Sequence, residues 1–328
     1  MRRREFITIL GGSALASPLA VHAQQERPFP VVGFLNSASK EGYAPRIAAV
    51  LRGLANAGFD EGRNVRIEFR HANGRYEQLP LLAAEFVRQQ VAVIFAGGTG
   101  AALAAKSATT VIPIVFSTSS NPVEIGLVSS LSRPGGNVTG TTRLNIEIWP
   151  KRLQLLREIV PTATGIALLV NPSNPSISKP MVQDATAEAQ KLGIELPVLW
   201  ASNEQEIDAA FMAISKLGVA ALVIPPDAFF NSHVAKLCST ALQQGIAMMA
   251  PERAFVDAGG LMSYGGHLDE GFYIAGNYLG RILKGEKPAD LPVQQSTRLT
   301  FAINLKTAKA LGLTIPPLVL GQADEVIE

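Results

Sequence analysis

The sequence contains a single cysteine, Cys238, among its 328 residues. One cysteine excludes an internal disulfide, and none follows the N-terminal leader (residues 1–23) to carry a lipid anchor. Histidine is also scarce: outside the leader only His71, His233 and His267 occur, and none has a second histidine at metal-ligand spacing. We therefore expect no metal and no cofactor, and we expect Cys238 to be a small buried core residue.

Charged residues make up only 17% of the chain, and the formal net charge is +2. Three arginines and one glutamate lie in the first five residues, so the rest of the chain is neutral. A neutral surface has no general attraction for nucleic acid or for anionic lipid. Aromatic residues are also few, at 6%, while apolar residues reach 47%. Many small and aliphatic residues suit parallel strands that are covered by helices on both faces.

The recognisable motifs of several enzyme classes are missing. The sequence has neither the G-x-S-x-G segment of many hydrolases nor the G-x-x-x-x-G-K-[ST] phosphate loop. The segment that begins at Gly98 resembles a dinucleotide fingerprint, but Leu103 stands where glycine or alanine is needed. No nucleophile, base and orienting residue can be assembled from the sequence. We therefore expect a binding protein and not an enzyme, with a secreted hydrolase as the disfavoured alternative.

Residues 1–23 have the parts of an export signal. Three arginines precede a short apolar stretch over residues 6–19, and the segment VHA at 21–23 resembles a signal-peptidase site. The segment RREFI at 3–7 fits the twin-arginine pattern, with an ordinary Sec leader as the alternative. These features predict export to the bacterial periplasm. No other apolar run approaches the roughly 20 residues that a membrane span needs.

Beyond the leader, short apolar runs alternate with segments of helical spacing. The predicted strands cover residues 31–35, 65–69, 91–96, 112–116, 137–142, 165–170, 195–199, 219–224, 246–249, 261–264 and 301–304. This alternation predicts an α/β fold of two doubly wound parallel-sheet lobes joined by a hinge near residues 141–145 and 265–268. We expect lobe I to comprise 24–142 plus 267–292, and lobe II to comprise 143–266 plus 293–328, the last segment being open to either lobe.

Polar residues recur where the predicted strands end. Ligands of open parallel sheets bind beyond the carboxyl ends of the strands, so we expect these residues to face one cleft. The candidate ligand-binding residues are Asn36, Gly98, Thr99, Ser117, Thr118, Asn121, Asn171, Asp227 and Glu252. The alternative for each is a helix cap or a turn, since those positions favour the same residue types.

This set of side chains suits a small zwitterion. Thr99 and the N–H groups of Gly100 and Ala101 begin a predicted helix, which makes an anion site for a carboxylate. Asp227, or otherwise Glu252, is the candidate acceptor for an ammonium group. Candidates for ring contacts with an apolar ligand side chain are Tyr43, Phe229, Phe230 and Tyr264. For the two phenylalanines, core packing is the alternative.

Several segments also match a known pattern. They are MRRREFI, VVGFLNS, AGGTGAALAAKSATT, IPIVFSTSSNPVEIGLVSSLSRPGGNVTG, KRLQLLREIVP, LLVNPSNP, GGLMSYG and ILKGEKPADLPVQQSTRLTFAINLKTAKALGLTIPP. Together they resemble the ABC transporter substrate-binding proteins of the tryptophan/tyrosine-binding type. The resemblance implies a type I periplasmic-binding fold that closes on a small organic solute, in some relatives an aromatic amino acid. It also implies an ABC permease and ATPase as partners.

The resemblance leaves two points open. Where relatives often have aspartate before the proline of the fourth-strand loop, this chain has Asn121, which removes a potential ammonium partner. A ligand-sensing module that signals to a membrane receptor uses the same fold and is the alternative function.

Overall fold

The computed structural model describes residues 29–143, 148–161, 163, 165–266, 268–296 and 298–328. The predicted leader lies outside these ranges, and so do residues 144, 145 and 267 of the expected hinge segments. Export therefore stays a prediction. In the ranges that the structure describes, no helix has the length and apolar character needed to cross a membrane.

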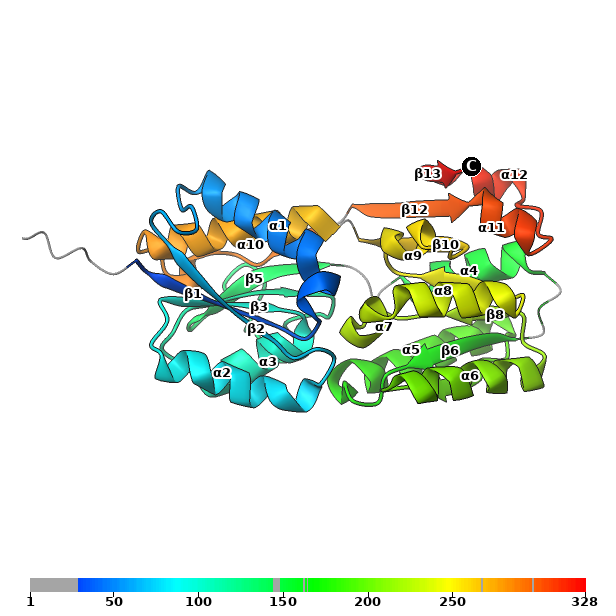
Figure 1. Ribbon diagram of the computed structural model, residues 1–328, viewed down its shortest axis with the longest axis horizontal. Helices are drawn as coiled ribbons and strands as arrows, with labels where there is room; N and C mark the ends of the chain where they lie inside the picture. Colours follow the sequence, from blue (N-terminus) through cyan, green and yellow to red (C-terminus); the bar gives the residue numbers. More distant parts are fainter. Residues whose placement is uncertain (1–28, 144–147, 162, 164, 267, 297) are drawn as a thin grey trace, which may run out of the picture.

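The first sheet has six parallel strands in the described part of the chain, in the order β11-β5-β4-β3-β1-β2. Its strands are β1 (Val31–Asn36), β2 (Arg66–His71), β3 (Val93–Gly97), β4 (Ile114–Thr118), β5 (Val138–Arg143) and β11 (Gln294–Ser296). Phe34 packs with α1 (Lys40–Asn56) and α10 (Leu268–Leu283) on one face, while the next residue, Leu35, packs with α2 (Leu79–Arg88) and α3 (Thr99–Ala108) on the other. Figure 1 shows these two helical layers.

The second sheet has seven described strands in the order β13-β12-β10-β9-β8-β6-β7. They are β6 (Ile166–Val170), β7 (Val198–Trp200), β8 (Ala221–Val223), β9 (Ala247–Ala250), β10 (Met262–Gly266), β12 (Leu299–Asn304) and β13 (Glu325–Ile327). One face is covered by α4 (Trp149–Ile159) and α5 (Pro175–Leu192). The other is covered by α6 (Glu204–Leu217), α7 (Ala228–Ser232), α8 (Val234–Gln243) and α9 (Arg253–Asp257).

Short elements complete the chain. Two 3₁₀ turns cover Tyr76–Gln78 and Pro288–Asp290, and two helices, α11 (Leu305–Ala310) and α12 (Pro317–Leu320), lie near the C-terminus. The α/β architecture with two mainly parallel sheets agrees with the sequence prediction.

The path between the sheets differs from the expectation in one place. Residues from 293 onward were expected in lobe II, with lobe I left open for this segment, and β11 pairs with β5 in the first sheet. The chain therefore passes between the sheets after β5, after β10 and again after β11. Because β12 starts at this third passage and runs away from it, it pairs antiparallel with β10, a departure from the all-parallel sheet that we expected.

Helices α1 and α10 pack at very short range. A Cβ atom added to Gly53 of α1 would overlap the backbone carbonyl of Tyr273, and one added to Gly276 of α10 would overlap that of Val50. The two glycines therefore let the helix backbones touch, which fixes α10 against the N-terminal half of the chain although it is more than 200 residues away in sequence.

Two local predictions can be compared with the structure directly. Cys238 is buried, as expected, and its thiol donates to the carbonyl of Phe255 at 3.2 Å. Burial raises the pKa of this thiol to about 12, so it stays protonated. The segment Asn121-Pro122, directly after the polar end of the predicted strand 112–116, is typical of a helix start, but no helix begins there: residues 122–126 form turns, in which Gly126 has φ of 69°. A positive φ is incompatible with a right-handed helix.

Candidate ligand-binding cleft

A cleft lies between the carboxyl ends of the two sheets. It encloses about 520 Å³, including space open to solvent. Its lining from the first half includes Ser37, Tyr43, Arg46, Tyr76, Gly98, Thr99, Gly100, Ser119 and Arg143. Its lining from the second half includes Asn174, Ile177, Asp227, Asn231 and Glu252.

Four of the nine candidate residues line this cleft, namely Gly98, Thr99, Asp227 and Glu252. Asn171 lies behind them and donates to Asp227 at 3.1 Å. Asn121 lines an adjoining chamber. Most of the residues selected because they follow a strand therefore lie at the cleft or next to it. That they contact a ligand stays a prediction.

Three candidates are buried within the first half. The Asn36 amide lies 2.8 Å from the imidazole Nδ1 of His71, so it links the ends of β1 and β2. Ser117 is 1% exposed and Thr118 is fully buried. None of the three lines the cleft, although the hydroxyl of Thr118 contacts that of Thr99, a lining residue.

The first turn of α3 lies at the cleft. Gly98, with φ of 99°, precedes the helix, and Thr99 and Gly100 line the cleft. The Thr99 hydroxyl is 2.5 Å from that of Thr118 and 3.0 Å from that of Ser120, which ties the loops after β3 and β4 together. Because the first-turn N–H groups of a helix have no intrahelical acceptor, they remain available for an anion.

Asp227 caps α7 and is 7% exposed. Its Oδ1 accepts from the N–H of Phe229 at 2.9 Å, and its Oδ2 accepts from the Tyr76 hydroxyl at 2.8 Å and, at a long 3.5 Å, from the Asn174 amide. All its hydrogen-bond donors in the described ranges are neutral. Burial outweighs these hydrogen bonds and raises the pKa of Asp227 above its usual range. A buried carboxylate without a cation is the partner that an ammonium group needs.

Glu252, the second acidic candidate, has its counter-charge already. The Arg46 guanidinium of α1 pairs with its carboxylate across the cleft, and Asn231 donates to its Oε1 at 3.0 Å. Burial alone would raise the pKa of Glu252, but Arg46 and Arg143 together hold it below its usual range. Of the two acids weighed from the sequence, Asp227 is therefore the one left for a ligand cation.

Sequence reasoning missed Arg46 and Arg143. Arg46 lies within α1, where an arginine usually faces solvent, yet it is 7% exposed. Arg143 is the last residue of β5, and in the sequence its only distinguishing feature is that it lies close to the expected hinge. Both residues can be recognised as part of the cleft only in the folded structure, where the second half of the chain forms the opposite wall.

The four aromatic candidates separate into two groups. Tyr43 lines the cleft with its ring beneath the Arg46 guanidinium, 5.0 Å from the ring centroid. Phe229 and Phe230 are buried in the core of the second half, as their alternative interpretation held. Tyr264 packs edge-on against Phe301 at 5.9 Å. Ring surface in the cleft comes from Tyr43 and from Tyr76, which was not predicted.

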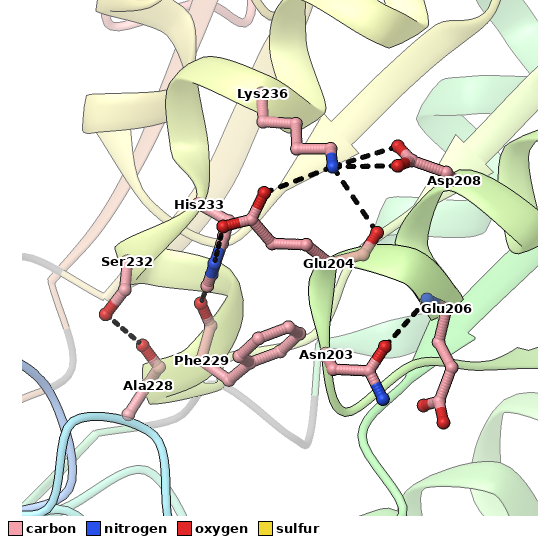
Figure 2. A network of polar contacts seen from close by, with 9 residues as sticks. All are labelled: Asn203, Glu204, Glu206, Asp208, Ala228, Phe229, Ser232, His233 and Lys236. Carbon is pink, nitrogen blue, oxygen red and sulfur yellow. Dashed lines mark hydrogen bonds and ion pairs between the residues drawn. The ribbon is translucent and has the colours of Figure 1, made fainter.

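The helix that Asp227 caps is anchored from behind by polar contacts (Figure 2). Lys236 of α8 lies 3.3 Å from the Glu204 carboxylate and 3.0 Å from that of Asp208, both on α6. The imidazole Nδ1 of His233 is 2.8 Å from the carbonyl oxygen of Phe229. This network holds α7 in position and thereby fixes where the Asp227 carboxylate lies.

The chain is similar to proteins of one family. A family model described as ABC transporter substrate binding protein matches residues 32–327. The tyrosine-binding protein of Clostridioides difficile (strain R20291) is 31% identical over 265 residues, which cover 80% of this chain and 75% of that protein.

Two solved structures are similar over the same length. One is an ABC domain from Streptococcus pneumonia in complex with L-Trp, with 27% identity and a TM-score of 0.82 over 91% of this chain and 100% of that one. The other is the ligand-free, open structure of a substrate binding protein with adhesive properties from Clostridium difficile, with 26% identity and a TM-score of 0.63 over 91% of this chain and 99% of that one. They confirm the predicted fold class. The chain belongs to the ABC transporter substrate binding protein family.

Proposed function

We propose that this substrate-binding protein captures an amino acid in the cleft between its two halves and presents it to an ABC permease and ATPase on the outer side of the bacterial membrane. The observation that carries the proposal is the Asp227 carboxylate, which is buried, lies on the cleft and is held by neutral donors. Across the cleft, the first turn of α3 offers N–H groups for a carboxylate.

Closure of two lobes is part of the proposal. We assign residues 30–143 and 268–296 to lobe I, and residues 148–266 and 298–328 to lobe II, so that the hinge falls at the three passages between the sheets. The higher TM-score to the L-Trp complex than to the ligand-free, open structure supports a closed arrangement here. Contacts between the halves, Arg46 with Glu252 and Tyr76 with Asp227, also belong to a closed cleft.

The other parts of the proposed function rest on membership of the family. Its members in these comparisons are binding proteins, which supports capture without turnover. Family membership supports transport over the sensing alternative and an extracytoplasmic location over any other. The tyrosine and L-Trp of two relatives make aromatic amino acids the first ligands to test.

A thermal-shift screen of the amino acids followed by calorimetry tests the proposal. A ligand at 100 times its dissociation constant is expected to stabilise the protein by about 2.7 kcal/mol. Asp227→Asn should weaken the best ligand by at least about 30-fold, because a buried charge pair is lost. Asp257→Asn, which removes an exposed aspartate of the same half outside the cleft lining, is the matched control and should bind normally. If no amino acid binds the wild-type protein, the proposal is wrong.

A further inference from the structure

Arg143 at the end of β5 is the most unusual side chain of the cleft. It is 8% exposed and lines the cleft, yet its Nε and Nη1 atoms have no hydrogen-bond partner among the residues that the structure describes. Buried guanidinium groups in proteins are normally paired, because an unpaired buried charge costs several kcal/mol. A group left in this state at a cleft indicates that its partner arrives from outside.

The surroundings of Arg143 do not neutralise it. Its guanidinium lies over the Phe272 ring at 5.4 Å, and its alkyl stem lies against Gly266. Glu252 is near enough to affect its pKa, but that carboxylate is already paired with Arg46. Burial lowers the pKa of Arg143 and the neighbouring Arg46 charge adds to that effect. The ring and the stem fix the position of the group without satisfying its charge.

We propose that Arg143 binds the carboxylate of the ligand, together with the first turn of α3, and so selects α-amino acids with a free carboxylate. This inference rests on the proposed function, that an amino acid occupies the cleft. The ligand then lies between two opposite charges, its ammonium group at Asp227 and its carboxylate at Arg143. Arg46 and Glu252 neutralise each other, so the cleft offers one free charge of each sign, as a zwitterion needs.

The placement of Arg143 also gives the direction of the ligand side chain. Arg143, Ser119 and Ile177 line both the cleft and an adjoining chamber of about 1320 Å³, including space open to solvent. The apolar lining of this side-chain chamber consists of Pro122, Ile125, Leu131, Ile177 and Pro180. A ligand held at Arg143 and Asp227 therefore directs its side chain past Ile177 into a chamber of mixed character, whose polar lining includes Ser120, Asn121, Glu124, Thr142, Asp184 and Gln295.

The test pairs a change in the protein with a change in the ligand. Wild-type protein, Arg143→Gln and Arg143→Lys are titrated calorimetrically with L-tryptophan and L-tyrosine, and with tryptamine and tyramine, which lack the carboxylate. If another amino acid is the best ligand, it and its decarboxylated amine are used. The wild type should prefer the acid over the amine by roughly 10- to 100-fold, the range of a charge-assisted pair. Arg143→Gln should lose most of that preference, leaving only the part due to the first turn of α3, while its affinity for the amine stays within about threefold.

Controls separate the possible failures. Arg133→Gln removes an exposed arginine of the same half and should leave both affinities unchanged. The amide of the best amino acid gives a readout in the wild-type protein alone and should bind as weakly as the amine, even if Arg143→Gln fails to fold. Equal losses for acid and amine would make Arg143 a structural residue and overturn the inference while the proposed function stands. A wild type that binds no amino acid overturns both.

Discussion

Arg46 and Glu252 form a buried ion pair that joins α1 of one half to the residue before α9 of the other half. Both side chains are almost excluded from solvent, at 7% and 5% exposure. The Asn231 amide donates a hydrogen bond to the second oxygen of the Glu252 carboxylate. Arg46 also donates to the carbonyl oxygen of Gly42 at 2.9 Å. Because the pair joins the two halves, we expect it to stabilise the closed cleft as well as the folded protein.

Arg46→Gln should open the ligand-free protein. Removing one partner of a buried pair usually costs about 3–5 kcal/mol, because the other charge stays buried. Here opening the cleft returns Glu252 to water, so the cost falls mainly on closure and less on unfolding. We expect a larger radius of gyration by small-angle X-ray scattering, about tenfold weaker amino-acid binding, and a small change in Tm.

Arg281→Gln is the control for this variant. Arg281 pairs with Glu286 at 2.6 Å within one half, and both side chains are about 40% exposed. Its loss should change neither the scattering nor the affinity. An Arg46→Gln protein that scatters like the wild type but melts much earlier would show that the pair stabilises the fold and not the closed cleft.

Asp227 gives the binding a defined dependence on pH. Its folded-state pKa is raised by burial, so in the ligand-free protein it takes up a proton at a higher pH than an ordinary aspartate. A protonated Asp227 cannot pair with an ammonium group, and ligand binding must expel the proton. Affinity should therefore fall as pH falls through the pKa of Asp227, by up to about tenfold per pH unit below it. Calorimetry between about pH 4 and pH 8 measures this slope.

Asp227→Asn is the matched variant, since asparagine also caps helices. Its weak residual binding should be flat over the same pH range. A raised folded pKa means that Asp227 favours folding below its unfolded pKa and loses that contribution as pH rises through the folded value. The ligand-free variant should thus be at least as stable as the wild type at pH 7. A wild-type affinity independent of pH would mean that Asp227 does not hold the ammonium group.

Local sequence patterns were enough for most of the fold. The helical spacing of apolar residues over 79–88 and 268–283 predicts two helices, and the structure has α2 (Leu79–Arg88) and α10 (Leu268–Leu283) at those bounds. Residues 65–69 alternate apolar and charged side chains, which is typical of a strand near a sheet edge, and β2 lies at the edge of the first sheet. The third passage between the sheets was expected at residue 293 but lies after β11, because β11 is a three-residue strand fixed by its pairing with Thr141–Arg143 and not by its own composition.

The candidate site was predicted only in part, for a similar reason. The rule about strand ends finds Thr99 and Asp227, because the position of each residue follows from the direction of the strand that precedes it. The same rule also selects Asn36, but this side chain hydrogen-bonds to His71 and does not line the cleft. Arg46 acquires its role from Glu252, 206 residues away in sequence. A pattern within one segment carries no information about such a partner.

Ile125→Trp tests whether the side-chain chamber sets the size of the ligand. Ile125 is half-buried in the loop after β4 and lines the chamber but is not part of the cleft lining with Asp227. A larger ring there should clash with bulky ligand side chains, and overpacking typically costs about 1–3 kcal/mol. Binding of the bulkiest amino-acid ligands should weaken by roughly tenfold or more, while that of alanine or serine, measured by competition, changes less than about threefold. Ile112→Trp, a half-buried isoleucine that packs on the core of the same half, controls for general strain. Equal weakening of large and small ligands would instead place the ligand side chain outside the chamber, because only a ligand that enters it can sense the added ring.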